Sequence, residues 1–271
     1  MALDTKPQAL PLIMVAPNGA RRTKVDHPAL PMSITETVET AVACFEAGAG
    51  AIHAHVRDET GAHVLDKDFY RALLSELNAA LPQMQVQITT EAVGKYTPDD
   101  QRKLVQELKP SLVSIAVREM VPDDDTHTAA EFYSWAMKEG VSVQHILYSA
   151  EDLDRFFDLV ENGSIPGITH QVLLVLGRYT DNQESAPEDL YPFLDRLKAR
   201  RSDHEIDWGV CAFGHRETEC LVHAIENGGK ARIGFENGLW NRDGAVAKDN
   251  ADRVRDLVSA LEEKNISVLS G

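Results

Sequence analysis

Residues 51–56 read Ala-Ile-His-Ala-His-Val, and this segment is the starting point for assigning the fold. Side chains alternate between the two faces of a β-strand, so a strand here carries two histidines on one face and apolar residues on the other. Amphipathic helical patterns at residues 34–47 and 67–80 flank it. The local order is therefore helix, strand, helix.

The same alternation of a short strand with a longer helix runs through the whole chain. The other strands are expected at residues 12–16, 85–90, 112–117, 142–148, 170–176, 206–213 and 231–236. The other helices are expected at residues 98–108, 129–139, 151–162, 187–200, 217–227 and 247–264. Eight strand–helix units within about 250 residues predict an α/β protein with the (β/α)8, or TIM-barrel, fold.

A doubly wound open sheet is the alternative fold. It would call for a G-x-G-x-x-G fingerprint after the first strand, where this chain has Pro17-Asn-Gly-Ala20. No linker or break in composition divides the sequence, so we expect residues 1–271 to form a single TIM-barrel domain.

Composition and charge exclude several classes of protein. The chain has 271 residues, 43 of them acidic and 27 basic, and its formal net charge of −16 argues against a nucleic-acid-binding face. No apolar stretch approaches the roughly 20 residues that span a bilayer, and the N-terminus lacks the pattern of a secretory signal. Three irregularly spaced cysteines argue against a disulfide framework. We therefore expect a soluble cytoplasmic protein that binds neither nucleic acid nor membrane.

Polar residues recur at every second position of four expected strands. In a closed barrel such a set faces the interior, near the carboxyl ends of the strands, where barrel active sites lie. The sets are His53 and His55; Gln87, Thr89 and Glu91; Ser114, Ala116 and Arg118; and Arg232, Gly234 and Glu236. An ordinary interior layer would be Val, Ile and Leu, so these residues indicate a functional site.

The two histidines and Glu236 are the candidate metal ligands. His53 and His55 lie about 6.5 to 7 Å apart along the strand, so both imidazoles can reach one ion. Glu236 would approach from the eighth strand, and two histidines with one carboxylate leave the open position of a catalytic zinc site. The alternative is a pair of core histidines bonded to the backbone, which the accompanying polar sets make less favourable. His63 lies in a polar stretch and is expected to be solvated.

Four motifs resemble the β-keto acid cleavage enzyme family. They are Ala16-Pro-Asn-Gly-Ala20, Ile52-His-Ala-His-Val-Arg57, Val210-Cys-Ala-Phe-Gly214 and Arg232-Ile-Gly-Phe-Glu236. The resemblance implies a zinc-binding TIM barrel, usually a homotetramer. It also implies transfer of coenzyme A from acetyl-CoA to a β-keto acid, giving acetoacetate and a new acyl-CoA. By the same resemblance His53, His55 and Glu236 are the Zn2+ ligands and Arg232 is a catalytic residue.

The sequence departs from this family at several positions. Asn237 follows Glu236 where the family has an aspartate that acts as a base, and an amide cannot accept a proton at neutral pH. Glu91 and Glu119 are the candidate replacement bases, although Glu91 could instead pair with an arginine of the site. Equally, the substrate and the reaction could differ from those of the family.

Four residues are the expected substrate contacts, namely Asn18, Arg21, Thr89 and Arg118. Arg21 and Arg118 suggest a substrate with more negative charge than the aminated keto acid of the family's namesake. Two other functions stay open. One is a zinc-dependent aldolase or hydrolase on the same barrel, and the other is a non-catalytic ligand-binding relative in which Asn237 marks lost chemistry.

Overall fold

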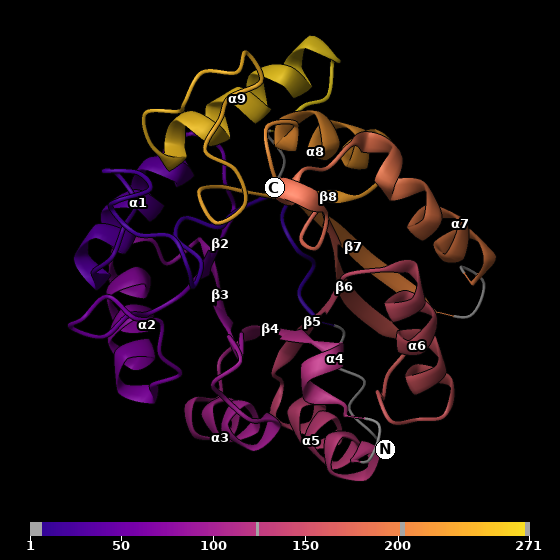
Figure 1. Cartoon of the computed structure of the whole chain (residues 1–271). Coiled ribbons are helices and arrows are strands. Elements are labelled where there is room, and N and C mark those ends of the chain that lie inside the picture. The colour runs from indigo at the N-terminus through magenta and orange to yellow at the C-terminus, as the bar shows by residue number, and fades with distance from the viewer. Residues whose placement is uncertain (1–6, 123–124, 201–203, 269–271) are drawn as a thin grey trace.

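Eight parallel strands close into a barrel in the order of the chain, with β8 pairing with β1. The computed structural model describes residues 7–122, 125–200 and 204–268 (Figure 1). The strands are β1 (Ile13–Val15), β2 (Ala51–Ala54), β3 (Gln85–Thr89), β4 (Leu112–Ala116), β5 (Ser142–Leu147), β6 (Thr169–Leu176), β7 (Glu205–Ala212) and β8 (Lys230–Ile233). The predicted TIM barrel is confirmed.

The helices form an outer ring around the strands (Figure 1). They are α1 (Ile34–Glu46), α2 (Lys67–Ala80), α3 (Pro98–Leu108), α4 (Val117–Met120), α5 (Thr126–Glu139), α6 (Ala150–Glu161), α7 (Tyr191–Ala199), α8 (Glu217–Glu226) and α9 (Asn250–Glu263), with short 3-10 turns η1 (Asp181–Gln183) and η2 (Pro187–Leu190). The helix expected at residues 187–200 is thus divided into η2 and α7, and α4 was not expected.

Local signals in the sequence explain where these helices begin. The Ser33 hydroxyl accepts a hydrogen bond from the Glu36 amide, and the Glu36 carboxylate accepts one from the Ser33 amide, which completes a capping box on α1. Thr97 and Asp100 form the same motif at α3, with Pro98 in the first turn. These caps mark the first turns of α1 and α3 by residues close in sequence.

The alternation predicted for the second strand is present. Ile52 and Ala54 belong to the main apolar core between strands and helices. His53 faces the barrel interior, where its Nδ1 donates to Gln87 Oε1 at 2.8 Å, and Gln87 Nε2 donates to Gln144 Oε1 at 2.9 Å. The barrel is therefore apolar on its outside and carries a polar network within.

Seven of the eight expected strands end one to three residues earlier than predicted, and the early ends of β8 and β4 affect predicted site residues. The β8 strand ends at Ile233, so Glu236 lies in the following loop rather than on the strand. The β4 strand ends at Ala116 and α4 begins at once, so the expectation that alternation turns Arg118 into the barrel is wrong. Among the described residues, none of the helices is long and apolar enough to cross a membrane.

Candidate metal centre and active-site cavity

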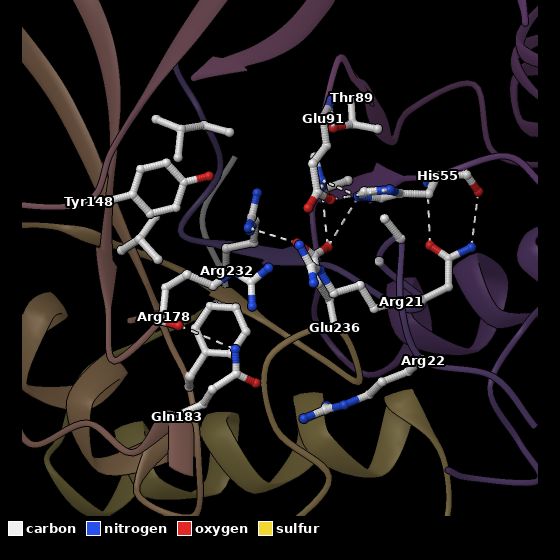
Figure 2. A pocket seen from close by; sticks show the side chains of 17 residues that line it. Arg21, Arg22, His55, Thr89, Glu91, Tyr148, Arg178, Gln183, Arg232 and Glu236 are labelled. Carbon is white, nitrogen blue, oxygen red and sulfur yellow. Dashed lines mark hydrogen bonds and ion pairs between the residues drawn. The ribbon is translucent and has the colours of Figure 1, made fainter. Parts of the chain in front are cut away.

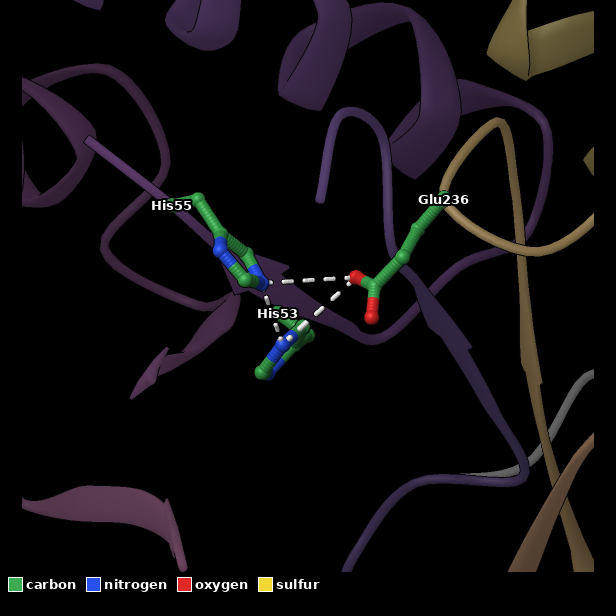
Figure 3. Close-up of side chains that lie close together, drawn as sticks. All are labelled: His53, His55 and Glu236. Atoms are coloured by element: carbon green, nitrogen blue, oxygen red, sulfur yellow. Dashed lines mark hydrogen bonds and ion pairs between the residues drawn. The ribbon is translucent and has the colours of Figure 1, made fainter. Parts of the chain in front are cut away.

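His53, His55 and Glu236 come together at the carboxyl end of the barrel (Figure 3). The two Nε2 atoms are 3.1 Å apart, and Glu236 Oε2 is 3.6 Å from each of them. Both imidazoles are buried, and the Glu236 side chain is 14% exposed. His53 lies on β2, His55 lies just after that strand, and Glu236 lies in the loop after β8.

The geometry of this triad suits a small divalent ion. Ligands bound at 2.0–2.2 Å in a tetrahedral arrangement lie roughly 3.3–3.6 Å from one another. The three facing atoms lie 3.1 to 3.6 Å apart. Glu236 Oε2 is buried and has no hydrogen-bond partner among the described residues. A cation would satisfy this otherwise costly carboxylate oxygen.

The surroundings of His53 and Glu236 favour the protonation states in which these side chains can bind a metal. Burial, and then the neighbouring charge of Arg232, lower the pKa of His53 well below its usual value, so its imidazole is neutral. Burial disfavours ionisation of Glu236, yet Arg232 and the two histidines hold its pKa well below the usual range. Since Gln87 Oε1 accepts a hydrogen bond from His53 Nδ1, the imidazole proton lies on Nδ1 and the Nε2 lone pair faces the triad, where it can bind a metal.

Arg232 lies directly beside the triad on β8. Its Nη2 donates to Glu236 Oε1 at 3.1 Å and contacts Cys211 Sγ at 3.5 Å. The Nε and Nη1 atoms of this buried guanidinium have no partner among the described residues. Arg232 therefore retains hydrogen-bond donors for an anionic group bound in the cavity.

The loop after β1 is fastened to the strand that carries the histidines. The Asn18 amide donates to His55 O at 3.0 Å and accepts from His55 N at 3.3 Å. Arg57 donates to Gly19 O at 2.6 Å and to Arg22 O at 2.8 Å. Asn18 lines the cavity, but its side chain is already occupied by the His55 backbone.

The loop that carries Glu236 is held from the opposite side. Glu217 accepts from the Gly234 amide at 3.2 Å, and Asn250 accepts from the Phe235 amide at 2.9 Å. Gly234 has a φ of +145°, and a Cβ at this position would clash with the Ala16 carbonyl oxygen. Helices α8 and α9 thereby set the position of the carboxylate ligand.

A small cavity of about 90 Å³ opens beside the triad. It is large enough for a small organic acid and too small to enclose a coenzyme A. Its polar lining is Asn18, Arg21, Arg22, His53, His55, Thr89, Glu91, Tyr148, Arg178, Gln183, Arg232 and Glu236 (Figure 2). Its apolar lining includes Ile146, Val175 and Phe213.

Glu91 is the second carboxylate that lines this cavity, besides Glu236 of the triad. Its side chain is 24% exposed, and Oε2 lies 4.0 Å from His55 Nδ1. The Thr89 hydroxyl accepts from the Glu91 amide at 3.0 Å, so Thr89 helps to shape the turn after β3. Glu91 is thus placed to exchange a proton with a molecule bound near the triad.

Glu119 and Asn237 do not line the cavity. Glu119 accepts from the Ala92 amide at 3.1 Å and from Gln101 Nε2 at 2.9 Å, so it braces the loop that begins at Glu91. Burial raises the pKa of Glu119. Asn237 is fully buried, and neither atom of its side-chain amide has a partner among the described residues.

Arg118 also lies outside the cavity lining. Its Nη2 pairs with Asp152 at 2.6 Å, and its guanidinium lies over the rings of Tyr148 at 4.6 Å and Tyr179 at 5.3 Å. Tyr148 itself lines the cavity. The structure therefore places Arg118 behind a wall residue.

Four polar cavity residues were missed by sequence reasoning: Arg22, Tyr148, Arg178 and Gln183. The signal available for Tyr148 and Arg178 was their position just after the fifth and sixth strands. The expectation that His63 is solvated is wrong, because it is 5% exposed and its ring lies 4.9 Å from that of His55.

Comparison with known proteins identifies relatives along nearly the whole chain. The 3-keto-5-aminohexanoate cleavage enzyme of Acetoanaerobium sticklandii is 25% identical over 258 residues, covering 93% of this chain and 92% of that protein. The 3-oxoadipate:acetyl-CoA acetyltransferase of Cupriavidus necator is 26% identical over 264 residues, covering 93% and 88%.

A solved structure supports the same architecture. Apo ObcA matches with a TM-score of 0.71 and 16% identity, and the match covers 90% of this chain but only 64% of ObcA. At this identity the likeness shows the fold alone.

The family model of the beta-keto acid cleavage enzyme matches residues 11–271. That span contains all eight strands and every residue of the triad. The protein is therefore an enzyme that belongs to the β-keto acid cleavage enzyme family.

Proposed function

We propose that this enzyme converts a β-keto acid and acetyl-CoA into acetoacetate and a new acyl-CoA, with a zinc ion held by His53, His55 and Glu236. The observation that carries the proposal is the buried triad beside Arg232 at the floor of a small cavity. The relatives named for keto acid cleavage and for acetyl transfer support the same chemistry.

The atoms of the products define the bonds that change. Acetoacetate contains the acetyl group of acetyl-CoA joined to the two carbons at the carboxylate end of the keto acid. A carbon–carbon bond therefore forms between the acetyl carbonyl carbon and carbon 2 of the keto acid. The acetyl–sulfur bond of acetyl-CoA breaks in that step and releases the coenzyme A thiolate. The thiolate then adds to carbon 3, the bond between carbons 2 and 3 breaks to leave the new acyl-CoA, and carbon 2 takes back the proton that it lost.

Carbon 2 must lose a proton before it can attack the acetyl group, and Glu91 is the proposed base. Its carboxylate faces the cavity next to His55, whereas Glu119 is engaged by Ala92 and Gln101 outside the lining. Glu119 is then a positioning residue for the Glu91 loop. Asn237 is proposed to contribute only through the shape of the loop after β8.

The substrate carboxylate is proposed to lie against the free Nε and Nη1 donors of Arg232. A zinc ion, when bound, would polarise the keto and carboxylate oxygens of the substrate as a Lewis acid. Two imidazole nitrogens and one carboxylate leave a position open for those oxygens.

Metal analysis combined with an acetoacetate assay tests this proposal. Purified protein should contain about one zinc per chain, and His55→Asn should lose both the metal and acetoacetate formation. His127→Asn is the matched control, because this histidine is 87% exposed and far from the triad in the fold.

Other outcomes would favour other functions. Turnover of a keto acid that does not need acetyl-CoA would indicate an aldolase or hydrolase. Tight ligand binding without turnover would indicate a binding protein. Full activity in protein that contains no divalent metal would overturn the proposed role of the triad.

A further inference from the structure

Arginines dominate the cavity of an otherwise acidic protein. Four of them line it, Arg21, Arg22, Arg178 and Arg232, against two carboxylates, Glu91 and Glu236. The cavity thus has an excess of positive charge, although the formal net charge of the whole chain is −16. One anionic group, the carboxylate common to all β-keto acids, does not account for four guanidinium groups.

Two of these arginines already have partners. Arg232 pairs with Glu236, and Arg22 donates to the carbonyl oxygens of Phe235 and Asn237. Arg178 and Arg21 differ, because neither side chain has a carboxylate or carbonyl partner among the described residues. The guanidinium of half-buried Arg178 lies over two aromatic rings, those of Phe213 at 5.3 Å and Tyr179 at 5.9 Å.

Arg178 lies on the opposite side of the barrel mouth from His55. Arg178 follows β6, and His55 follows β2, so the two positions are four strands apart in a closed barrel of eight and lie across its mouth from each other. Figure 2 shows Arg178 and Tyr148 on one side of the cavity and His55 on the other, with Glu236 between them.

The wall on the Arg178 side of the cavity is apolar. Ile146, Val175 and Phe213 belong to one cluster of buried apolar residues on β5, β6 and the end of β7, and all three line the cavity. A ligand that extends from the triad toward Arg178 therefore meets the polar side chains of the triad at one end and a guanidinium beside apolar side chains at the other.

We infer that the preferred substrate is a β-keto acid whose far end carries a second carboxylate, and that Arg178 binds this group. The inference rests on the proposed function and specifies its substrate class. The aliphatic middle of such a dicarboxylate lies along Ile146, Val175 and Phe213. Arg21, which is exposed at the rim, adds positive charge but no buried contact.

A phosphate of coenzyme A offers the same anionic chemistry to an arginine. Arg178 is half-buried in a cavity too small for the coenzyme, which favours the carboxylate as its partner. The two sources predict different kinetics. A carboxylate contact affects the KM of the keto acid, and a phosphate contact affects the KM of acetyl-CoA.

The test compares 3-oxoadipate with 3-oxohexanoate, two keto acids of equal chain length that differ in the far carboxylate. The metal-loaded enzyme should prefer 3-oxoadipate in kcat/KM by roughly ten- to a hundredfold, the range of a charge-assisted hydrogen bond. Arg178→Gln should abolish that preference by lowering kcat/KM for 3-oxoadipate more than for 3-oxohexanoate, and Arg178→Lys should restore part of it. Arg196→Gln on α7, outside the cavity, is the matched control.

Three results would overturn the inference. They are equal use of the two acids by the wild-type enzyme, an unchanged preference in Arg178→Gln, and a rise confined to the KM of acetyl-CoA. The last would assign Arg178 to a coenzyme phosphate. Thermal melting of each variant checks that it is folded.

Equilibrium binding of both acids, measured by calorimetry without acetyl-CoA, separates this inference from the proposed reaction. If 3-oxoadipate binds in a way that depends on Arg178 but no acetoacetate forms, the proposed reaction is wrong and the inferred substrate specificity stands. If acetoacetate forms equally well from both acids, the proposed reaction stands and the inferred substrate specificity is wrong.

Discussion

Glu91 is the residue whose replacement separates proton transfer from metal binding. Glu91→Gln keeps the size of the side chain but removes the proposed base, so we expect kcat to fall by about 10² to 10⁴-fold while zinc content stays unchanged. Glu119→Gln should cost less, because this side chain braces the loop from outside the cavity. Steady-state kinetics with metal analysis of both variants checks the assignment, and an equal loss in the two would contradict it.

Gln87 supports the proposed metal site through a hydrogen bond to His53 Nδ1. It does not bond to the Nε2 atoms that would bind the metal. Its amide oxygen accepts from His53 Nδ1 and so orients the ring. We expect Gln87→Met to weaken zinc binding about 10- to 100-fold, as loss of such supporting contacts usually does. Competition with a chromophoric chelator measures this.

The matched control lies two residues earlier on the same strand. Gln85 donates to Ala9 O at 3.0 Å and makes no hydrogen bond to a ligand histidine. Gln85→Met should therefore bind zinc as the wild-type protein does. A comparable weakening in both variants would point to general damage to β3.

At the scale of elements, helices α8 and α9 share a buried ion pair beneath the loop of Glu236. Arg253 Nη2 lies 2.9 Å from Glu217 Oε2, and both side chains are completely buried. Burial raises the pKa of Glu217 from 4.5 to about 7, and the attraction to Arg253 offsets only part of that rise. The stabilising contribution of this carboxyl is thus complete below 4.5 and is lost as pH rises through about 7.

Arg253→Met would leave the Glu217 carboxylate buried without its countercharge. We expect a loss of about 3–5 kcal/mol in the free energy of unfolding at a pH of about 8, and a smaller loss at about 6, where the carboxyl can bind a proton. Urea unfolding at the two pH values tests the sign. A loss that is larger at the lower pH would contradict this account.

Arg255 on the same helix provides the control for that measurement. Its side chain is 55% exposed and lies 3.7 Å from Asp249 and 4.0 Å from Asp252. Exposed pairs of this kind contribute about 0–1 kcal/mol. Arg255→Met should therefore change the unfolding free energy little at either pH.

At the scale of the whole molecule, metal binding should be visible in thermal stability. A ligand that binds only the folded state adds about 2.7 kcal/mol at a free concentration a hundredfold above its Kd. We expect a strong chelator to lower the Tm by several degrees and added zinc to restore it. Calorimetry of the His53→Asn, His55→Asn double variant should show a Tm that responds to neither treatment.

The fold was predictable from the sequence because its signals are local and repeated. The strand–helix units carry their own alternation, and several helices begin at a side-chain cap, such as Ser33 with Glu36 and Thr97 with Asp100. His53 and His55 lie within one strand segment, so a period of two residues was enough to place both imidazoles on one face. The same alternation also pointed to Glu236, but Glu236 lies in the loop beyond β8. Strand alternation is therefore not the reason that its side chain reaches the triad.

The sequence by itself determined the order of eight strand–helix units and the pair of histidines, since regular backbone converts residue spacing directly into direction. Only the tertiary structure decided which charged residues beyond the strand ends face the cavity. Arg178 enters it, whereas Arg118 turns on α4 to pair with Asp152. The physical reason is that a side chain after a strand takes its direction from the loop or helical turn that follows, and contacts between distant segments set that path.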